Sequence, residues 1–258
     1  LMTNPKVYID GSAGTTGLRI QERLANRRDL DVTVLDYEDR RDVELRRAAT
    51  ATADLTILCL PDDAAIEAAA WAKESGTKVV DASTAHRVND DWAFGLPEMA
   101  PTQREKIQNA QNVSNPGCYP TGMILSLRPI IEQGLLGKDV PITIHALSGY
   151  SGGGKNLITK WEGGQKNLEK LPFESPYALH TAHKHVPEMT KYAGLTHEPQ
   201  FIPAVGPFIN GMRLEIPIHK AVLPESTTAN DIWEVLDQRY ANEQFVKINK
   251  IEDTIVYS

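Results

Sequence analysis

The sequence predicts an α/β protein in which a parallel sheet with crossover helices comes first and a second, strand-rich part follows. Short apolar runs alternate with helical patterns over the beginning of the chain, which is typical of βαβ units. This rhythm changes near residues 100–115, and strand patterns dominate afterwards. The chain has 258 residues, 41% of them hydrophobic, which is enough for a large core and for one or two domains.

The first part consists of strands that are each followed by a helix or a turn. Strands are predicted at residues 6–10, 31–36, 55–61 and 77–83, and helices at 18–27, 62–73 and 101–111. The run at 55–61 is apolar up to Pro61, as expected of a strand covered on both faces. Asp62 or Asp63 can cap the helix that follows, and Gly76 can end it.

The second part begins with a helix and continues with strands. Residues 119–133 favour a helix because Pro120 falls in its first turn, where proline is tolerated, and Gly134 can stop it. Strands at 141–147 and 211–219 alternate between apolar and polar side chains, which predicts a half-buried sheet, mixed or antiparallel. An amphipathic helix is predicted at 228–240. We therefore expect two domains, residues 1–115 and 116–258.

The segment GSAGTTG joins the first predicted strand to the first helix and places glycines at Gly11, Gly14 and Gly17. Glycines in this position let the backbone approach a pyrophosphate, whose charge is stabilised by the start of the helix. The spacing differs from the commoner GxGxxG, and a plain turn is the alternative. The first part is therefore predicted to be a Rossmann-type nucleotide-binding domain.

The residues after the second strand bear on which dinucleotide is bound. Asp36 lies where an acidic residue usually takes the ribose hydroxyls of NAD. Arg40 and Arg41 follow, and they could meet the 2′-phosphate of NADP or simply form a solvated surface. Charge reasoning alone leaves both cofactors open.

Cys118 is the sharpest candidate for chemistry, because it follows a Pro116-Gly117 turn and opens a predicted helix. The unpaired N–H groups and the dipole at a helix start lower the pKa of a cysteine, whose thiolate is the nucleophile. A buried structural role is the alternative for Cys118 and is our prediction for Cys59, which lies inside an apolar strand. Two cysteines do not make a disulfide framework.

The segment HTAHKHVPE brings His180, His183 and His185 close together. No carboxylate or cysteine at ligand spacing completes a zinc set, so no metal is predicted. Acid–base work beside a thiolate is the functional alternative, since imidazole titrates near neutral pH, and a structural role is equally open.

The segment SGYSGGGKN matches the GxxxxGK part of a P-loop at Gly149, Gly154 and Lys155. Asn156 stands where a P-loop needs Ser or Thr to hold magnesium, so hydrolysis of a nucleoside triphosphate is not expected. The loop could hold a smaller phosphate through its N–H groups, or be a plain glycine loop.

Charge and hydropathy exclude other classes of protein. The formal net charge of −7 argues against a general nucleic-acid binder. No apolar run approaches the ~20 residues of a membrane helix, and the N-terminus has no signal-peptide pattern, so we expect a cytoplasmic protein without membrane contacts.

Together the parts indicate the reduction of an acyl phosphate through a thioester. A thiolate would attack, phosphate would leave, and a nicotinamide hydride would give the aldehyde while a histidine moves protons. Two alternatives remain. A nucleotide-sensing protein would keep the glycine turn without chemistry, and a cysteine hydrolase would use Cys118 and a histidine without a cofactor.

The sequence resembles the N-acetyl-γ-glutamyl-phosphate reductases of arginine biosynthesis, in their shorter form, within the aspartate-semialdehyde dehydrogenase superfamily. The resemblance extends over nearly the whole chain and rests on GSAGTTG (11–17), DASTAHR (81–87), FGLPE (94–98), SNPGCYPTG (114–122), SGYSGGGK (148–155), HKHVPEM (183–189) and VGPFINGM (205–212). It implies NADP as cofactor, N-acetyl-glutamyl phosphate as substrate, its semialdehyde and inorganic phosphate as products, and a homodimer or homotetramer with an α+β catalytic and dimerisation domain. A related acyl phosphate, of aspartyl or aminoadipyl type, is the alternative substrate.

The resemblance also implies roles for particular residues. Cys118 would be the nucleophile and His185 the acid or base, with His183 as the alternative. Asn210 and Gly211 stand where longer members have an arginine-glycine pair, which leaves Arg87 and Arg213 as candidates to hold the substrate. The family's C-terminal glycine-rich segment and helix have no counterpart up to Ser258, so we expect a less complete nucleotide domain. Cofactor contacts would come from Gly11, Ser12, Ala13, Gly14, Thr15, Thr16, Gly17 and Ser83, and substrate contacts from Arg87, Asn115, Ser151, Lys155 and Arg213.

Overall fold

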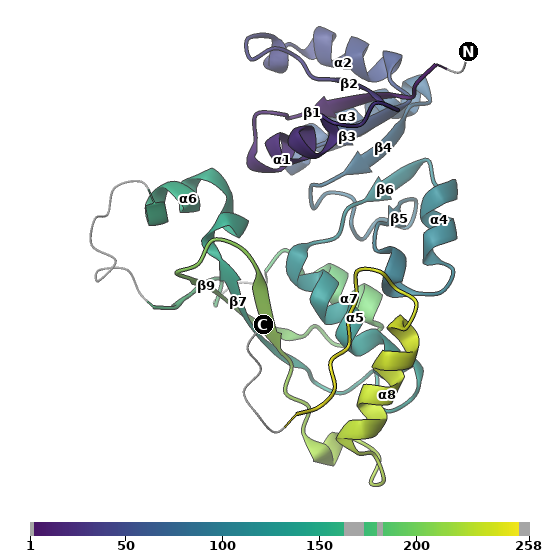
Figure 1. Cartoon of the computed structure of the whole chain (residues 1–258), viewed down its shortest axis with the longest axis vertical. Coiled ribbons are helices and arrows are strands. Elements are labelled where there is room, and N and C mark those ends of the chain that lie inside the picture. Colours follow the sequence, from purple (N-terminus) through teal and green to yellow (C-terminus); the bar gives the residue numbers. More distant parts are fainter. Residues whose placement is uncertain (1–2, 163–172, 180–182, 253–258) are drawn as a thin grey trace.

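Two β-sheets organise the protein in a computed structural model that describes residues 3–162, 173–179 and 183–252 (Figure 1). The strands of the first sheet are β1 (Lys6–Asp10), β2 (Asp31–Thr33), β3 (Leu55–Leu58), β4 (Lys78–Asp81), β5 (Ala93–Phe94) and β6 (Asn112–Ser114). They pair in the order β2-β1-β3-β4-β6-β5, and every pairing is parallel. The predicted α/β class with a Rossmann-type first domain is confirmed.

The second sheet is mixed. Its strands are β7 (Thr143–Gly149), β8 (Ser175–Pro176), β9 (Gln200–Gly206) and β10 (Met212–Glu215), in the order β10-β7-β9-β8. The central pair β7 and β9 is parallel, while β10 and β8 pair antiparallel at the two edges. The strand predicted at 211–219 is therefore shorter than expected, and β9 carries the centre of the sheet instead.

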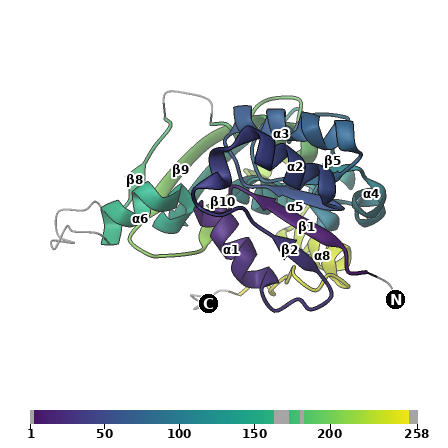
Figure 2. The same ribbon diagram turned by 90° about the horizontal axis from the view of Figure 1, so that it is seen from above.

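The helices cover both sheets. They are α1 (Thr15–Leu24), α2 (Val43–Thr52), α3 (Asp62–Ser75), α4 (Gln103–Asn109), α5 (Cys118–Glu132), α6 (Gly154–Glu162), α7 (Val186–Ala193) and α8 (Ala229–Tyr240). In the first domain α2 and α3 lie side by side on one side of β1 and α1 lies on the other (Figure 2). Among the described residues, no helix combines the length and apolar composition that a membrane crossing requires.

Two apolar clusters hold these elements together. Ala65, Ala68 and Ala72 recur on one face of α3 and are fully buried against Leu58 and Val79 of the parallel sheet. The larger cluster joins α5 and α7 to the second sheet and also takes in Phe94 of β5. Because this cluster includes residues of both sheets, the start of α5 is held firmly against the first domain.

Candidate active site

The glycine turn and the loops that carry Ser83 and Cys118 lie at the carboxyl edge of the parallel sheet. Gly11 follows β1 and lies against the carbonyl group of Cys59, which follows β3. The N–H of Ala82, after β4, donates to Leu58 O (2.9 Å), and the N–H of Asn115, after β6, donates to Asp81 O (2.7 Å). The glycine turn and the Cys118 loop therefore lie on one edge, where ligands bind in open parallel sheets.

Close packing explains two glycines of the turn. Gly11 has a φ of +84°, and a Cβ there would lie 2.3 Å from Cys59 O. A Cβ on Gly17 would lie 2.4 Å from Gly11 O, so this glycine lets α1 approach the end of β1. Gly14 is the N-cap of α1 and supplies no side-chain hydrogen bond, which leaves the first N–H groups of the helix available to an anion.

The residues after β2 are solvent-accessible. Asp36 and Arg41 are exposed, and Arg40 stacks on the ring of Tyr37 with its guanidinium carbon 3.4 Å from the ring centroid. The stacked pair offers a flat cationic surface beside the turn that follows β1.

Ser83 belongs to a buried network at the end of β4. Its N–H and hydroxyl donate to the two carboxylate oxygens of Asp81, at 2.8 and 2.7 Å. His86 Nδ1 lies 2.6 Å from Asp81 Oδ2, and the ring of His86 stacks on Trp92. These hydrogen bonds within the protein fix the loop that carries Ser83 beside the predicted cofactor site. The Ser83 hydroxyl itself donates to Asp81 and not toward a ligand.

Cys118 is the first residue of α5, after the N-cap Gly117. The residue is exposed, yet surrounding protein removes enough water from its sulfur to raise its pKa above the ordinary value. The N–H groups of Tyr119 and Cys118 and the charge of Arg87 oppose this rise without overcoming it. The predicted net lowering of the pKa is therefore wrong, because desolvation outweighs the helix start. Cys59 is partly buried and its pKa is raised to about 11, chiefly by burial.

His185 lies beside the Cys118 loop. A Cβ on Gly117 would be 2.8 Å from His185 Nε2, while His185 Nδ1 is buried and has no hydrogen-bond partner within residues 3–162, 173–179 and 183–252. Burial lowers the pKa of His185 to about 3, and the neighbouring His183, Arg87 and Lys184 add to this effect, so the ring is neutral.

His183 packs against His185 with ring centroids 4.6 Å apart. Its Nδ1 accepts the backbone N–H of His185 at 3.2 Å, so a neutral His183 carries its proton on Nε2. His180 lies outside the described residues. Within the described ranges, no group of three His, Cys, Asp or Glu side chains is arranged to hold a metal ion.

The two arginines proposed to hold substrate are engaged elsewhere. Arg87 is 8% exposed and donates to Glu188 Oε1 (2.8 Å), Asn115 O (3.0 Å) and Ala82 O (3.1 Å), so it presents no free guanidinium. Arg213 is exposed and pairs with Glu215 at 3.2 Å. It points away from the sheet face on which Leu214 packs toward α5, because neighbouring strand residues face opposite sides. The substrate contacts predicted for Arg87 and Arg213 stay predictions.

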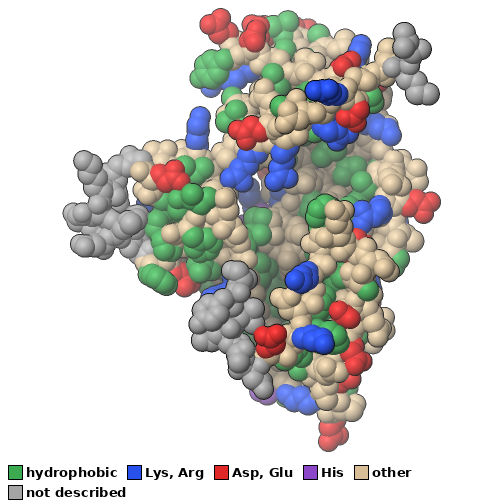
Figure 3. All heavy atoms as spheres, in the orientation of Figure 1, with side chains coloured by type: hydrophobic (Ala, Val, Ile, Leu, Met, Phe, Trp, Pro, Cys, Tyr) green, Lys and Arg blue, Asp and Glu red, His purple; other side chains and the backbone are tan. Residues whose placement is uncertain are grey.

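The glycine-rich loop of the second domain approaches the first domain. Ser151 Oγ lies 2.7 Å from Asn210 Oδ1, which also accepts from Arg19 of α1 at 3.2 Å. A Cβ on Gly154 would lie 3.9 Å from Thr15 Oγ1, so the start of α6 faces the start of α1. Lys155 is exposed on the first turn of α6. Figure 3 shows Lys and Arg side chains around a hollow between the two halves of the molecule.

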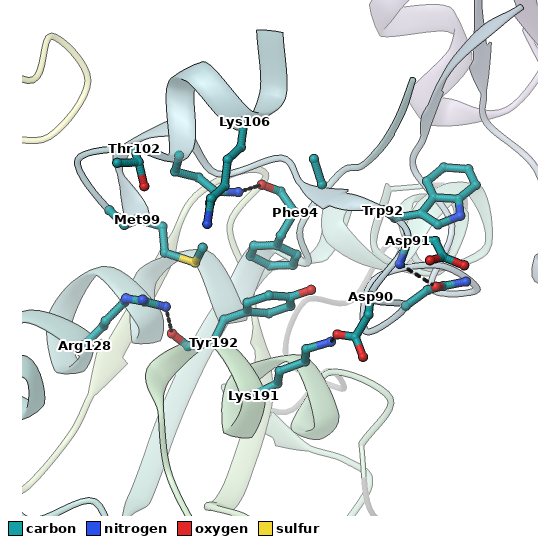
Figure 4. Close-up of a pocket in the computed structure, with 14 residues that line it drawn as sticks. Asp90, Asp91, Trp92, Phe94, Met99, Thr102, Lys106, Arg128, Lys191 and Tyr192 are labelled. Carbon is teal, nitrogen blue, oxygen red and sulfur yellow. Dashed lines mark hydrogen bonds and ion pairs between the residues drawn. The ribbon is translucent and has the colours of Figure 1, made fainter. Parts of the chain in front are cut away.

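A separate cavity of about 500 Å³ lies between the β5 region, α4 and α7 and contains none of the predicted site residues (Figure 4). Phe94 and Tyr192 stack in its wall with ring centroids 3.8 Å apart. The hydroxyl of Tyr192 donates to Arg87 O (2.8 Å), so this wall supports the arginine beside the Cys118 loop.

Comparisons with known proteins identify the family. The family model described as "Semialdehyde dehydrogenase, NAD binding domain" matches residues 6–110, and "Semialdehyde dehydrogenase, dimerisation domain" matches residues 118–256. The N-acetyl-gamma-glutamyl-phosphate reductase 2 of Nostoc sp. is 46% identical over 98% of this chain and 79% of its own length. The N-acetyl-gamma-glutamyl-phosphate reductase of Burkholderia lata is 46% identical over 98% of this chain and 80% of its own length. The chain belongs to the N-acetyl-gamma-glutamyl-phosphate reductase family.

Solved structures share the fold at low identity. Aspartate semialdehyde dehydrogenase II of Vibrio cholerae has a TM-score of 0.70 at 19% identity, covering 92% of this chain and 79% of its own. Aspartate semialdehyde dehydrogenase of Candida albicans, solved with NADP, has a TM-score of 0.61 at 15% identity over 90% and 76% of the two chains. Members of the reductase family and these dehydrogenases therefore share one architecture. The resemblance seen in the sequence is confirmed.

Sequence reasoning missed one residue of this site, Glu188. It is 1% exposed and accepts hydrogen bonds from Arg87 and from the N–H of Gly117. Glu188 lies three residues after His185 in HKHVPEM. Its contact with Arg87 spans 101 residues, so no local sequence pattern predicts it.

Proposed function

We propose that this chain catalyses the NADPH-dependent reduction of N-acetyl-L-glutamyl 5-phosphate to the 5-semialdehyde and phosphate. The observation that carries the proposal is the position of Cys118. It opens α5 at the sheet edge that also holds the glycine turn, with His185 Nε2 bordering the adjacent Gly117. The names of relatives at 46% identity supply the substrate and the oxidoreductase class.

The residues of the glycine turn fit a dinucleotide. Gly11 and Gly17 let the turn and the start of α1 pack closely on the ends of β1 and β3, and α1 begins without a side-chain cap or an acidic residue in its first turn. Thr15, Thr16 and Gly17 would hold the pyrophosphate through their N–H groups, with Ser12, Ala13 and Gly14 lining the approach. Arg40 and Arg41 would take the 2′-phosphate that distinguishes NADP. When bound, NADPH supplies a hydride.

Cys118 and His185 carry the covalent chemistry of the proposal. Because the thiol has a raised pKa, its proton must leave as the sulfur attacks, and the imidazole of His185 beside the loop would take it. Cys118 Sγ bonds to the acyl carbon, the carbon–oxygen bond to phosphate breaks, and the leaving phosphate takes the proton that His185 removed. Bound NADPH would supply the hydride for the thioester carbon. Cys118 Sγ would then leave that carbon as the aldehyde forms, and a solvent proton would reach the sulfur through His185.

The substrate phosphate would lie near the glycine-rich loop. Ser151 and the exposed Lys155 stand at the start of α6, which faces α1, and Asn115 is exposed beside Cys118. A lysine and free N–H groups suit a phosphate that must be held and then released.

One assay run in reverse tests the function. The protein is incubated with N-acetyl-glutamate semialdehyde, phosphate and NADP⁺, and reduced nicotinamide should form only when phosphate is present. Cys118→Ser should abolish turnover and leave the Kd for NADP⁺ within about threefold, since the sulfur is not part of the glycine turn. Cys59→Ser is the matched control and should keep turnover. Turnover without phosphate, or full activity of Cys118→Ser, would overturn the proposal.

We infer further that the chain divides functionally at residues 115 and 116 and assembles as a homodimer or homotetramer. The family model described as a dimerisation domain, which matches residues 118–256, supports this inference. Light scattering after size-exclusion chromatography should give a mass of two or four chains, and a single-chain mass would refute it.

A further inference from the structure

Glu188 on α7 is a buried acidic residue that the proposed reaction does not use. It is 1% exposed, and each carboxylate oxygen has a partner. Oε1 accepts from Arg87 Nη1 at 2.8 Å, and Oε2 accepts the N–H of Gly117 at 2.9 Å. A buried carboxylate is tolerated only when it is paired and hydrogen-bonded, and both conditions are met here.

Arg87 makes Glu188 part of a bridge between the two domains. It lies on the loop after β4, and two further donors of its guanidinium are occupied by Ala82 O and Asn115 O. Tyr192 of α7 donates to the backbone carbonyl of Arg87 at 2.8 Å. The guanidinium is therefore held in one plane and cannot turn without breaking several bonds.

Gly117 is where the bridge reaches the nucleophile. A Cβ at this position would be 2.7 Å from Glu188 Oε1 and 2.8 Å from both Arg87 Nη1 and His185 Nε2. The absence of a side chain therefore lets the ion pair and the imidazole approach the backbone directly before Cys118.

The first turn of α5 has few donors. Pro120 has no N–H, and Thr121 N donates to Gly117 O, so Cys118 and Tyr119 supply the free N–H groups of this helix start. Both of these groups act on the Cys118 sulfur. Glu188 holds the N–H of Gly117, which lies in the peptide unit directly before the one that carries the Cys118 N–H.

We propose that Glu188 is a positioning residue, which with Arg87 fixes the Gly117 peptide and thereby aims the N–H groups of Cys118 and Tyr119 at the reacting sulfur. The proposal rests on the proposed function for its catalytic consequence. Its geometric part, the control of the Cys118 environment, is independent of which substrate is reduced.

The charges of Arg87 and Glu188 act on the pKa of Cys118, which a merely structural contact would leave unchanged. Arg87 lowers the pKa of Cys118 and Glu188 raises it. Two further titratable groups of this region are His185, the N-cap of α7, whose ring is neutral, and Tyr177, which follows β8. Removal of the Glu188 charge alone therefore leaves Arg87 uncompensated and should move the pKa of the thiol downward.

The test compares Glu188→Gln with Glu132→Gln. The control makes the same chemical change in an ion-paired glutamate at the other end of α5, where Glu132 pairs with Arg128 and Arg239. For Glu188→Gln we expect the midpoint of the rate of iodoacetamide alkylation of Cys118 to move to lower pH. We also expect kcat to fall about 10- to 100-fold with the KM for NADPH within about threefold, because the sulfur is more ionised but misaligned. Glu132→Gln should match the wild type in both measurements.

Arg87→Lys provides a second variant that keeps the charge. A lysine can pair with Glu188 but cannot also hold Ala82 O and Asn115 O, so kcat should fall while the alkylation midpoint stays near that of the wild type. Wild-type kcat in both variants, or an unchanged alkylation midpoint in Glu188→Gln, would overturn the proposal. A shifted midpoint in a protein that reduces no acyl phosphate would instead refute the proposed function and leave the bridge intact.

Discussion

Replacement of Gly17 by alanine tests whether the close approach of α1 to β1 is needed for cofactor binding. A Cβ at this position would lie 2.4 Å from Gly11 O and 2.7 Å from Ser12 Cα, whereas ordinary van der Waals contact begins near 3.4 Å. Both neighbours are backbone atoms, so no side chain can rotate away. The start of α1 must therefore move by about 1 Å from the turn.

The expected magnitudes are modest for stability and larger for binding. Overpacking costs about 1–3 kcal/mol, and the better helix propensity of alanine returns about 0.5–1 kcal/mol, so the free energy of unfolding should fall by about 1 kcal/mol. A displaced helix start loses at least one hydrogen bond to the charged pyrophosphate. Such a bond contributes about 1.5–3 kcal/mol, which corresponds to roughly a 10- to 150-fold rise in the Kd for NADPH.

Gly14→Ala is the matched control, three positions earlier in the same turn. Gly14 has a φ of −77°, and its Cβ would meet only Gly11 O at an ordinary 3.5 Å. We expect its Kd to stay within about threefold of the wild type. Titration of NADPH fluorescence, with circular dichroism to confirm folding, gives both constants. An unchanged Kd in folded Gly17→Ala, or an equal loss in both variants, would refute the argument from helix packing.

Three further predictions concern charged or titratable side chains. The Asp10 carboxylate is 2% exposed and accepts hydrogen bonds from Arg46 at 3.0–3.2 Å. Arg46→Leu removes this partner and should lower the free energy of unfolding in urea by about 3–5 kcal/mol, most of which the double variant Asp10→Leu/Arg46→Leu should recover. A single variant as stable as the wild type would contradict this. The pKa of His185 falls from 6.5 to about 3 on folding, so the unfolded chain binds the extra proton between these values. Stability should accordingly drop by about 2 kcal/mol between pH 7 and pH 5, and this part of the slope should vanish in His185→Gln. Cys118 in the free enzyme should alkylate with a midpoint above that of a free cysteine, and a lower midpoint in a mass-spectrometric time course would show that the helix start outweighs desolvation.

The elements that the sequence predicts well are those whose signals are local. β1 has the predicted bounds, and α3 ends at Gly76, which takes the left-handed conformation with a φ of +76°. α8 begins where Thr228 and Asp231 form a capping box. Each boundary depends on residues within a few positions of it, so the pattern alone identifies it.

Two elements that the sequence analysis did not predict, α7 and β9, lack such signals. α7 has only eight residues, too few for a helical period to emerge, and its second residue is Pro187. β9 contains Pro203 and Gly206, two residue types that argue against a strand when the sequence alone is considered. It nevertheless pairs along its whole length with β7. Tertiary packing in the larger apolar cluster, which includes Met189 and Phe201, stabilises both elements. Their own residues would not.

The candidate site shows the same division between local and distant information. The glycine turn and Cys118 were visible because a turn and a helix start are local features. The sign of the Cys118 pKa was not predictable, since desolvation depends on protein that packs around the sulfur from elsewhere in the chain. Arg87 could not be assigned either, because its partner Glu188 lies 101 residues away.

The contact between Arg87, Glu188 and Gly117 explains why three separate motifs occur together in one chain. DASTAHR supplies the arginine, SNPGCYPTG the glycine and HKHVPEM the carboxylate. Loss of the arginine or the carboxylate leaves its partner as an unpaired buried charge, and a side chain in place of the glycine would clash with both. An apolar contact of similar volume would be at least as stable, since buried ion pairs gain little after desolvation. It would not, however, fix a direction. A carboxylate with one oxygen on a guanidinium and the other on a peptide N–H restricts the orientation of the residue before Cys118, and a defined orientation is what the proposed nucleophile requires.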